Sequence, residues 1–310
     1  MVGGNRMKLS KTRPVKRNRI RESVGSRTFD IILIIFMFLF LLVTLYPVWY
    51  VLVVSLSNGK AVMAGKVLLW PVDFTLATYK VVLRDPSILT GFKNTIIYTV
   101  LGTFINLALT TLCAYPLSRP GLPGKGIFMK LVVFTMFFSG GMIPTYLVVN
   151  QLKMIDTVWA MVLPGAISTY NMIVMRTFFL GIPESLHECA CLDGASELQV
   201  LWKIILPLSK AIIATMVLFY AVGHWNSYMD ALLYLNDKNL FPLQSILRNM
   251  VVEGQLSEAQ ATVGGGSSFE VVETTMKYAV IVVSTLPIVL IYPFVQKYFV
   301  KGVMIGSVKG

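Results

Sequence analysis

Residues 29–55 read FDIILIIFMFLFLLVTLYPVWYVLVVS, an almost continuous apolar stretch whose only charged residue is Asp30. A helix of about 20 apolar residues crosses the roughly 30 Å hydrocarbon core of a bilayer, so this stretch is long enough to span it. The apolar core of a secretory signal peptide is shorter, about 7–15 residues. We therefore expect an uncleaved membrane-spanning helix here.

The composition of the whole sequence points the same way. Charged residues make up only 14% of the 310 residues, whereas 55% are hydrophobic. A soluble protein carries about 25% charged residues. The apolar blocks long enough to span a bilayer lie near 29–55, 94–117, 127–149, 157–180, 211–235 and 278–300. They predict an all-α integral membrane protein with six transmembrane helices, divided into a basic tail (1–28), a transmembrane domain (29–300) and a C-terminal tail (301–310).

The charge distribution predicts the orientation of these helices. Of the net charge of +12, residues 1–28 supply +8, from nine basic residues and one acid. A basic run can bind nucleic acid, but this run precedes an apolar stretch and is better explained by the positive-inside rule and anionic lipids. The turn at 117–126 and the C-terminal tail are also basic, whereas 236–277 holds five acids against three basic residues. Six spans with both termini in the cytoplasm satisfy this pattern.

The segment 181–210 joins the predicted fourth and fifth spans, and counting spans from a cytoplasmic N-terminus places it in the cytoplasm. Pro183 followed by Glu184 is typical of a helix start, because proline is tolerated there and an acid suits the helix dipole. Gly194 is expected to end that helix. A second short stretch is expected to be amphipathic, with an apolar face formed by Leu198, Leu201, Trp202 and Ile205.

This segment contains a sequence signature. Residues 188–195 read ECACLDGA, and residues 204–207 read IILP. Together they resemble the E-A-A-x-x-x-G-x9-I-x-L-P signature of permease subunits in ATP-binding cassette (ABC) importers. Cys189 stands where the signature has its first alanine, and cysteine is also small and apolar. The resemblance implies the ABC type I importer permease fold, with a cytoplasmic coupling helix in this loop.

Other stretches resemble carbohydrate-uptake permeases similar to the maltose importer's smaller channel subunit, and this resemblance covers nearly the whole chain. The matching residues are Asp156-Thr157, Ala160 and Leu163-Pro164, which fit a D-T-x-x-A-x-x-L-P stretch, together with Trp225-Asn226 and Leu286-Pro287. The stretches SGGMIP (139–144) and KGVM (301–304) resemble a subgroup associated with complex oligosaccharides. The implied cargo is a sugar, with an oligosaccharide favoured, and a permease for a non-sugar solute is the alternative.

The resemblance implies that the short helix inserts into a groove on an ATPase and passes force to the membrane helices. Small side chains allow a close approach, and Gly194 allows a turn that a side chain would obstruct. The implied ATPase-coupling residues are Glu188, Cys189, Ala190, Asp193, Gly194, Ala195, Ile204, Leu206 and Pro207. The alternative is an ordinary amphipathic helix on the membrane surface with a glycine C-cap.

The implied complex lies in the bacterial cytoplasmic membrane. Its other members would be a second homologous permease subunit, a dimer of ABC ATPases and an extracytoplasmic solute-binding protein, together with the sugar substrate and membrane lipids. The sequence holds no G-x-x-x-x-G-K-[ST] phosphate-binding loop. ATP would therefore be hydrolysed by the partner, and the chain itself is not expected to be an enzyme. No cofactor and no nucleic-acid partner is expected.

Polar side chains inside the predicted spans are candidates for a substrate path, because such groups are costly in hydrocarbon. Amides can bond sugar hydroxyls, and aromatic rings can pack against sugar C–H faces. The candidates are Tyr170 and Asn171 in the fourth span and His224, Trp225, Asn226 and Tyr228 in the fifth. The alternative is that these groups bond across helices as packing contacts or that the aromatic rings lie at the membrane interface.

The three cysteines are Cys113, Cys189 and Cys191. Their spacing fits no disulfide framework, and C-x-C without another ligand nearby is weak support for a metal site. We therefore expect small apolar fillers and no metal. A proton- or sodium-coupled carrier is a further alternative, but that class is expected to show inverted repeats and buried acids, and the predicted spans are poor in acids.

Overall fold

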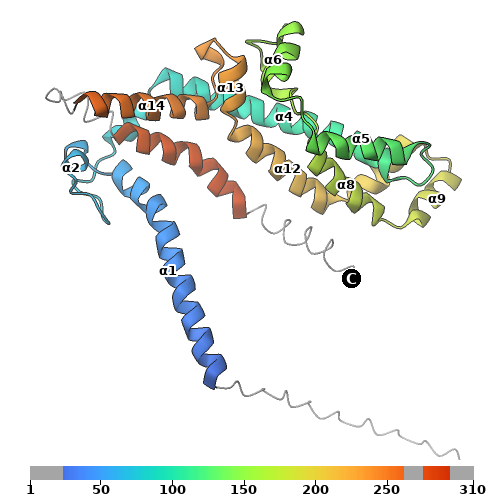
Figure 1. The fold of residues 1–310 in the computed structure, drawn as a ribbon, viewed down its shortest axis with the longest axis horizontal. Coiled ribbons are helices and arrows are strands. Elements are labelled where there is room, and N and C mark those ends of the chain that lie inside the picture. Colours follow the sequence, from blue (N-terminus) through green and yellow to red (C-terminus); the bar gives the residue numbers. More distant parts are fainter. Residues whose placement is uncertain (1–23, 262–274, 294–310) are drawn as a thin grey trace, which may run out of the picture. The chain divides into compact units, whose positions relative to one another are not determined.

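The computed structural model describes residues 24–261 and 275–293, and this part of the chain is helical without any strand (Figure 1). The basic tail up to residue 23, the glycine-rich stretch 264–268 and the C-terminal tail lie outside the described residues. The chain divides into one unit that ends at Trp49 and a second that begins at Tyr50.

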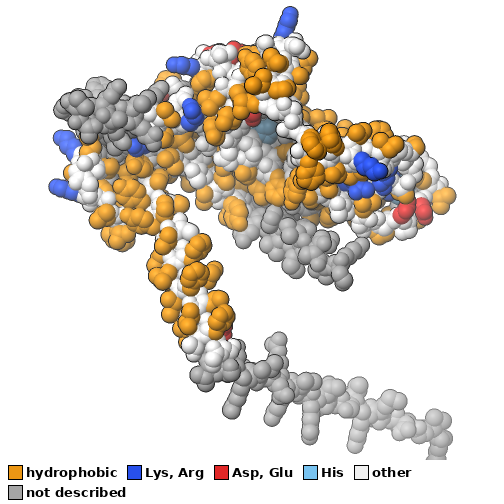
Figure 2. All heavy atoms as spheres, viewed as in Figure 1, with side chains coloured by type: hydrophobic (Ala, Val, Ile, Leu, Met, Phe, Trp, Pro, Cys, Tyr) orange, Lys and Arg blue, Asp and Glu red, His pale blue; other side chains and the backbone are white. Residues whose placement is uncertain are grey.

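The helix α1 (Val24–Ser55) contains the apolar stretch with which the sequence analysis began. Its 32 residues correspond to about 48 Å of helix, which exceeds the roughly 30 Å hydrocarbon core. Side chains from residue 25 to residue 49 are exposed around the helix, and most are large and apolar (Figure 2). An apolar surface on every side is what a lipid environment requires, so the first predicted span is confirmed as a helix long enough to cross a membrane.

The second unit is built from shorter helices around one long helix. Its elements are α2 (Gly59–Met63), α3 (Ala77–Val82), α4 (Pro86–Ser118), α5 (Lys125–Phe137), α6 (Met142–Gln151), α7 (Val158–Val162), α8 (Thr169–Leu180), α9 (Glu184–Leu192), α10 (Glu197–Val200), the π-helical turn η1 (Leu201–Ile205), α11 (Leu206–Leu208), α12 (Lys210–Trp225), α13 (Met229–Tyr234), the 3₁₀ turn η2 (Lys238–Leu240), α14 (Leu243–Ala261) and the helix Thr275–Pro293.

Within the described residues, three helices are long and apolar enough to cross a membrane: Gly25–Ser55, Pro86–Ser118 and Thr275–Pro293. Two further pairs satisfy the same criteria only if each bent pair counts as one span. One is α5 with α6, bent by 111°, and the other is Glu197–Leu208 with α12, bent by 86°. The described chain therefore contains three to five candidate spans.

The segment 157–180 differs from the continuous helix that the sequence predicted. It forms the short helix α7 and the longer helix α8, separated by residues 163–168. The break follows from Pro164, which lacks an N–H donor and cannot continue the helix, and from Gly165, whose φ is +72°. The segment 211–235 is likewise divided into α12 and α13, with Asn226, Ser227 and Tyr228 between them.

The long helix α4 contacts α7, α8, α12 and α14 and is the centre of the second unit. Its buried face is rich in polar and small residues that repeat every three or four positions; the buried residues are Ile88, Gly91, Asn94, Thr95, Tyr98, Gly102, Thr103, Asn106, Thr110, Thr111, Ala114, Tyr115, Leu117 and Ser118. Large apolar side chains, among them Ile96, Val100 and Phe104, are exposed on another face. This arrangement suits a membrane helix, because its polar groups find partners only inside the protein.

The first half of α4 holds the segment that leads into α14. The Asn94 amide donates to the carbonyls of Asn239 and Phe241, at 2.7 and 3.1 Å, and the Tyr98 hydroxyl donates to the Leu240 carbonyl at 2.7 Å. The Thr95 hydroxyl accepts the Leu243 N–H at 2.8 Å. These bonds satisfy backbone groups of a non-helical turn and of the first residue of α14, which have no partner within a helix.

The other half of α4 belongs to a large apolar cluster. The cluster comprises Ala114, Tyr115, Leu117, Met172, Met175, Phe179, Ala190, Val200, Leu201, Ile205, Ile212, Met216 and Tyr220. These residues come from α4, α8, α9, α10, η1 and α12. The segment after α8 is therefore packed into the same core as the long helices.

A carboxylate fixes the loop before α7 to the loop after α13. Asp156, whose φ is +57°, accepts hydrogen bonds from the backbone N–H groups of Asn236 and Asp237 and from the Asn236 amide. Donation by the Asp237 and Asn236 backbones holds the pKa of the Asp156 carboxyl below its usual range. Asp156 thus has a structural role in joining two loops, whereas the Thr157 hydroxyl donates to the Met154 carbonyl within its own loop.

We predict that Thr95→Val destabilises the protein, because valine has the shape of threonine but leaves the buried Leu243 N–H without an acceptor. An unsatisfied buried donor costs about 1–3 kcal/mol of unfolding free energy. Thr95→Ser keeps the hydroxyl and is the matched control. Thermal unfolding of the purified protein in detergent compares the two variants, and an equal loss of stability in both would contradict the assigned role of the hydroxyl.

Candidate functional site

The helix α9 begins and ends where the sequence predicted. Pro183 precedes its first residue, Glu184 lies in the first turn, and Asp193 follows its last residue. Gly194 has a φ of +79°, and its N–H donates to the Cys191 carbonyl at 3.0 Å. This left-handed residue satisfies a carbonyl at the helix end, as glycine commonly does.

After Gly194 the chain reverses direction and enters α10. Ser196 and Gln199 form a capping box, in which each side chain bonds the other residue's backbone N–H. The Ala195 N–H also donates to the Ala190 carbonyl at 3.0 Å. The two short helices α9 and α10 therefore form a fixed elbow, which we call the α9–α10 elbow (residues 184–200).

The predicted coupling residues separate into two sets. Ala190 is buried in the apolar cluster, and Ala195, Ile204 and Leu206 are half-buried and pack against it. The residues exposed at the surface are Glu188, Cys189, Asp193, Gly194 and Pro207. One side of the loop is thus fixed to the core, while the other side is available to a partner.

The predicted apolar face of the second stretch is only partly correct. Leu201 and Ile205 are buried, but Leu198 and Trp202 are 61% and 67% exposed. The π-helical geometry of η1 contributes to this difference, because it changes the angular spacing that an α-helical periodicity assumes. With Leu192, which is 88% exposed, these side chains give the loop an exposed apolar surface.

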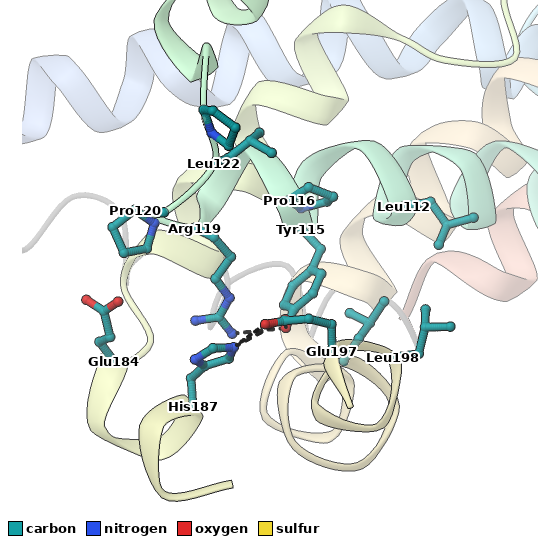
Figure 3. A pocket seen from close by; sticks show the side chains of 13 residues that line it. Leu112, Tyr115, Pro116, Arg119, Pro120, Leu122, Glu184, His187, Glu197 and Leu198 are labelled. Carbon is teal, nitrogen blue, oxygen red and sulfur yellow. Dashed lines mark hydrogen bonds and ion pairs between the residues drawn. The ribbon is translucent and has the colours of Figure 1, made fainter. Parts of the chain in front are cut away.

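A pocket of about 620 Å³ lies between the end of α4 and the α9–α10 elbow (Figure 3). Its lining comes from α4, the turn 119–123, α9, α10 and η1. Most of the lining is leucine and proline, and the polar side chains are Tyr115, Arg119, Glu184, His187 and Glu197.

Four of these polar side chains contact one another. The Tyr115 hydroxyl donates to Glu197 Oε2 at 2.7 Å, and His187 Nε2 lies 3.0 Å from Glu197 Oε1. Arg119 Nη2 donates to the Tyr115 hydroxyl at 3.4 Å, and its guanidinium lies 4.8 Å from the centre of the Tyr115 ring. The sequence analysis missed this network, since its members come from three segments and match no motif.

A second polar group joins α4, α8 and α12. The Asn106 amide lies 3.1 Å from His224 Nε2, and the hydroxyls of Thr110 and Tyr220 lie 2.6 Å apart. The Tyr220 hydroxyl also accepts the Ser168 N–H at 3.3 Å. A Cβ atom added at Gly102 would overlap the His224 ring. His224 therefore has a packing role between α4 and α12.

The remaining substrate-path candidates differ in exposure. Trp225 is buried, donates to the Ser284 carbonyl at 3.0 Å and packs edge-on against Phe92. Asn171 is buried near the start of α8. The exposed candidates are Tyr170, Asn226 and Tyr228. The structure thus brings His224 and Trp225 into helix contacts and leaves three polar or aromatic side chains accessible.

Comparison with known proteins covers nearly the whole chain. Residues 12–305 match the family model described as "Binding-protein-dependent transport system inner membrane component". The polygalacturonan/rhamnogalacturonan transport system permease protein YtcP of Bacillus subtilis is 44% identical over 92% of this chain and 99% of its own length. The protein LplC of the same organism is 45% identical over 94% and 98%.

A solved structure is also similar to this chain over most of its length. One chain in the crystal structure of a bacterial ABC transporter involved in the import of the acidic polysaccharide alginate is 36% identical. It covers 90% of this chain and 99% of its own length, with a TM-score of 0.82. The helical fold and the α9–α10 elbow are consistent with the family match and with the similar relatives. The chain belongs to the family of binding-protein-dependent transport system inner membrane components.

Proposed function

We propose that the chain is a membrane-spanning permease subunit of an ABC importer and that its cargo is an oligosaccharide. The family supports the transport role. Relatives named for polygalacturonan, rhamnogalacturonan and alginate support the cargo class. A non-sugar solute is the second candidate, because a relative 28% identical to this chain is named for the uptake of osmoprotective compounds.

The importer would contain a second, homologous permease subunit, two copies of an ATPase and an extracytoplasmic solute-binding protein. The family name itself includes dependence on a binding protein. The exposed apolar side chains of the second unit would face either lipid or the second permease. ATP would be hydrolysed by the partner, since this sequence has no phosphate-binding loop.

The proposed topology has six spans, with both termini and residues 181–210 in the cytoplasm. The basic residues at 1–28 support it through the positive-inside rule. The three long helices and the two bent pairs give five spans, and α7 with α8 would form the sixth. The bent pairs and the α7–α8 pair would then act as broken spans, which membrane proteins tolerate where the irregular backbone is covered by protein or lines a water-filled cavity.

Labelling of single cysteines tests this topology. In a chain without Cys113 and Cys191, we expect a membrane-impermeant maleimide to label the exposed Cys189 only after the cells are permeabilised. A second variant without native cysteines but with Gln151→Cys, at the exposed end of α6, should be labelled in intact cells. Labelling of Cys189 in intact cells would overturn the proposed orientation.

The α9–α10 elbow is the feature that best supports coupling to an ATPase. Glu188, Cys189 and Asp193 are exposed on it, whereas Ala190 packs with residues of α4, α8 and α12 in the apolar cluster. A push on the exposed side of α9 would therefore reach three membrane helices through one close-packed core. Protein interiors are dense enough to transmit such a displacement.

We predict that Gly194→Val abolishes the increase in ATP hydrolysis that the loaded binding protein causes, and with it uptake. Valine disfavours a φ of +79°, so the elbow must change shape while the membrane helices still insert. Gly65→Val is the matched control, because Gly65 also has a positive φ and open space around its Cβ position. The rate of ATP hydrolysis and the rate of uptake can both be measured with the purified complex in lipid vesicles. Normal coupling in Gly194→Val would mean that the elbow does not couple the ATPase to transport.

The helix breaks support a location for the substrate path. α7 packs against α13, and α8 packs against α12. The break at 163–168 lies between α7 and α8, and the break at 226–228 lies between α12 and α13. Both breaks therefore separate the pair α7–α13 from the pair α8–α12. Irregular backbone at membrane depth requires protein or water around it. The exposed Asn226 and Tyr228 lie at one of these breaks, and Tyr170 directly follows the other.

We predict that Asn226→Leu lowers uptake severalfold while the complex still assembles, because it removes an exposed amide at the break. Asn171→Leu should also lower uptake, but with a loss of thermal stability, because Asn171 is buried. Asn150→Leu changes an exposed asparagine near the end of α6 and should have no effect. If both Asn226→Leu and Asn171→Leu transport normally, the substrate path lies elsewhere.

A further inference from the structure

One face of α9 carries two potential metal ligands. His187 and Cys191 are four residues apart, which places them one above the other on an α-helix. Cys191 Sγ lies 3.8 Å from His187 Nδ1 and 3.7 Å from Nε2. Imidazole nitrogen and thiolate sulfur are both preferred ligands of Zn²⁺.

The turn at Gly194 supplies a third ligand from α10. It returns the chain so that Glu197 Oε1 lies 3.0 Å from His187 Nε2. One ligand atom from each of His187, Cys191 and Glu197 can be chosen such that all three lie within 4.8 Å of one another. The sequence analysis considered only the C-x-C spacing of Cys189 and Cys191, whereas the structure pairs Cys191 with His187.

These separations can be compared with those of a tetrahedral zinc site. Bond lengths of about 2.1 Å to nitrogen or oxygen and about 2.3 Å to sulfur place nitrogen and oxygen ligands about 3.4 Å apart and nitrogen and sulfur ligands about 3.6 Å apart. The distances from His187 to Glu197 and to Cys191, 3.0 and 3.7 Å, are close to these values. A small change of side-chain torsion angles would bring the three ligands around one ion.

We propose that His187, Cys191 and Glu197 form a binding site for a divalent cation that prefers nitrogen and sulfur ligands, with Zn²⁺ as the representative ion. Three protein ligands and one water complete a tetrahedral shell. On binding, the Cys191 thiol loses its proton to solvent, and the ion replaces the hydrogen bond between His187 and Glu197. The ion would then fasten α9 to α10.

Neighbouring side chains orient one ligand of this site and reduce its affinity for a cation. The Tyr115 hydroxyl donates to Glu197 Oε2, and both carboxylate oxygens lie near His187 Nε2, Oε1 at 3.0 Å and Oε2 at 3.2 Å. The bond from Tyr115 orients the carboxylate, as outer hydrogen bonds to metal ligands do. The Glu197 side chain is 62% exposed, so an ion has access from solvent. Arg119, which bonds Tyr115, adds a positive charge nearby and weakens cation binding. We therefore expect a reversible, regulatory site on the elbow.

The experiment measures protection of a thiol in the purified transporter complex after treatment with a chelator. The rate at which a maleimide modifies Cys191 is followed by mass spectrometry of the peptide that contains it, with and without Zn²⁺. We expect Zn²⁺ to slow modification of Cys191 by roughly tenfold or more, because the metal-bound sulfur is a poor nucleophile. The rate at Cys189 should stay unchanged, and Mg²⁺, which prefers oxygen ligands, should protect neither thiol.

Variants then test each ligand. His187→Ala and Glu197→Gln should each abolish the protection of Cys191, whereas Cys189→Ser should retain it. Hydrogen exchange over residues 184–200 should slow when Zn²⁺ is added to the wild type but not to Glu197→Gln. The proposal is overturned if Cys191 is not protected, if Cys189 is protected equally, or if protection survives in His187→Ala and Glu197→Gln. These measurements do not depend on transport, so their failure is distinct from failure of the proposed function.

Discussion

The hydrogen bonds along the buried face of α4 are the interaction on which the second unit depends. In a bilayer, a polar group that finds no partner inside the protein costs several kcal/mol. On α4 polar side chains are paired with α12, with η2, with the start of α14 and with α10, whereas Thr99 Oγ1 and Thr103 Oγ1 are buried without a hydrogen-bond partner among the described residues. The helix is therefore polar toward its neighbours and apolar toward its surroundings, the reverse of a helix in a soluble protein. Because each bond has a specific partner, the bonds also determine which helix lies at which height along α4.

The same helix connects the two regions that concern function. Its middle contacts α8 and α12, which flank the helix breaks, and its end carries Tyr115 in the apolar cluster that holds the α9–α10 elbow. Under the proposed coupling role, a displacement of the elbow would act on the helices beside the breaks through a continuous core rather than through a flexible loop. This continuity explains why the loop after α8 has short, well-capped helices where a simple connection would need only a few residues.

The sequence analysis predicted the features that depend on local chemistry. The first span follows from the length of its apolar stretch, and the bounds of α9 follow from Pro183, Glu184 and Gly194. The division of 157–180 into α7 and α8 was not predicted, because the apolar composition of the segment was given more weight than the helix-breaking residues Pro164 and Gly165. The importance of α4 was also missed, although its buried polar residues Asn94, Tyr98, Asn106 and Thr110, with Gly102 between them, recur every four residues. Of the proposed ligands, His187 and Cys191 are neighbours through their helical spacing, whereas Glu197 joins them only through the chain reversal at Gly194, which no linear spacing reveals.

The close approach of α4 and α12 at Gly102 has a mechanical consequence. The His224 ring occupies the space that any side chain at position 102 would fill, and it is bonded to Asn106 one turn further along. Sliding α12 along α4 by one turn, about 5.4 Å, would drive the ring into Tyr98 or Asn106. The ring thus interlocks α4 and α12, and the two helices must move together as one rigid body. Any relative movement of the helices around α4 would then be concentrated at 163–168 and 226–228, where the backbone is not helical.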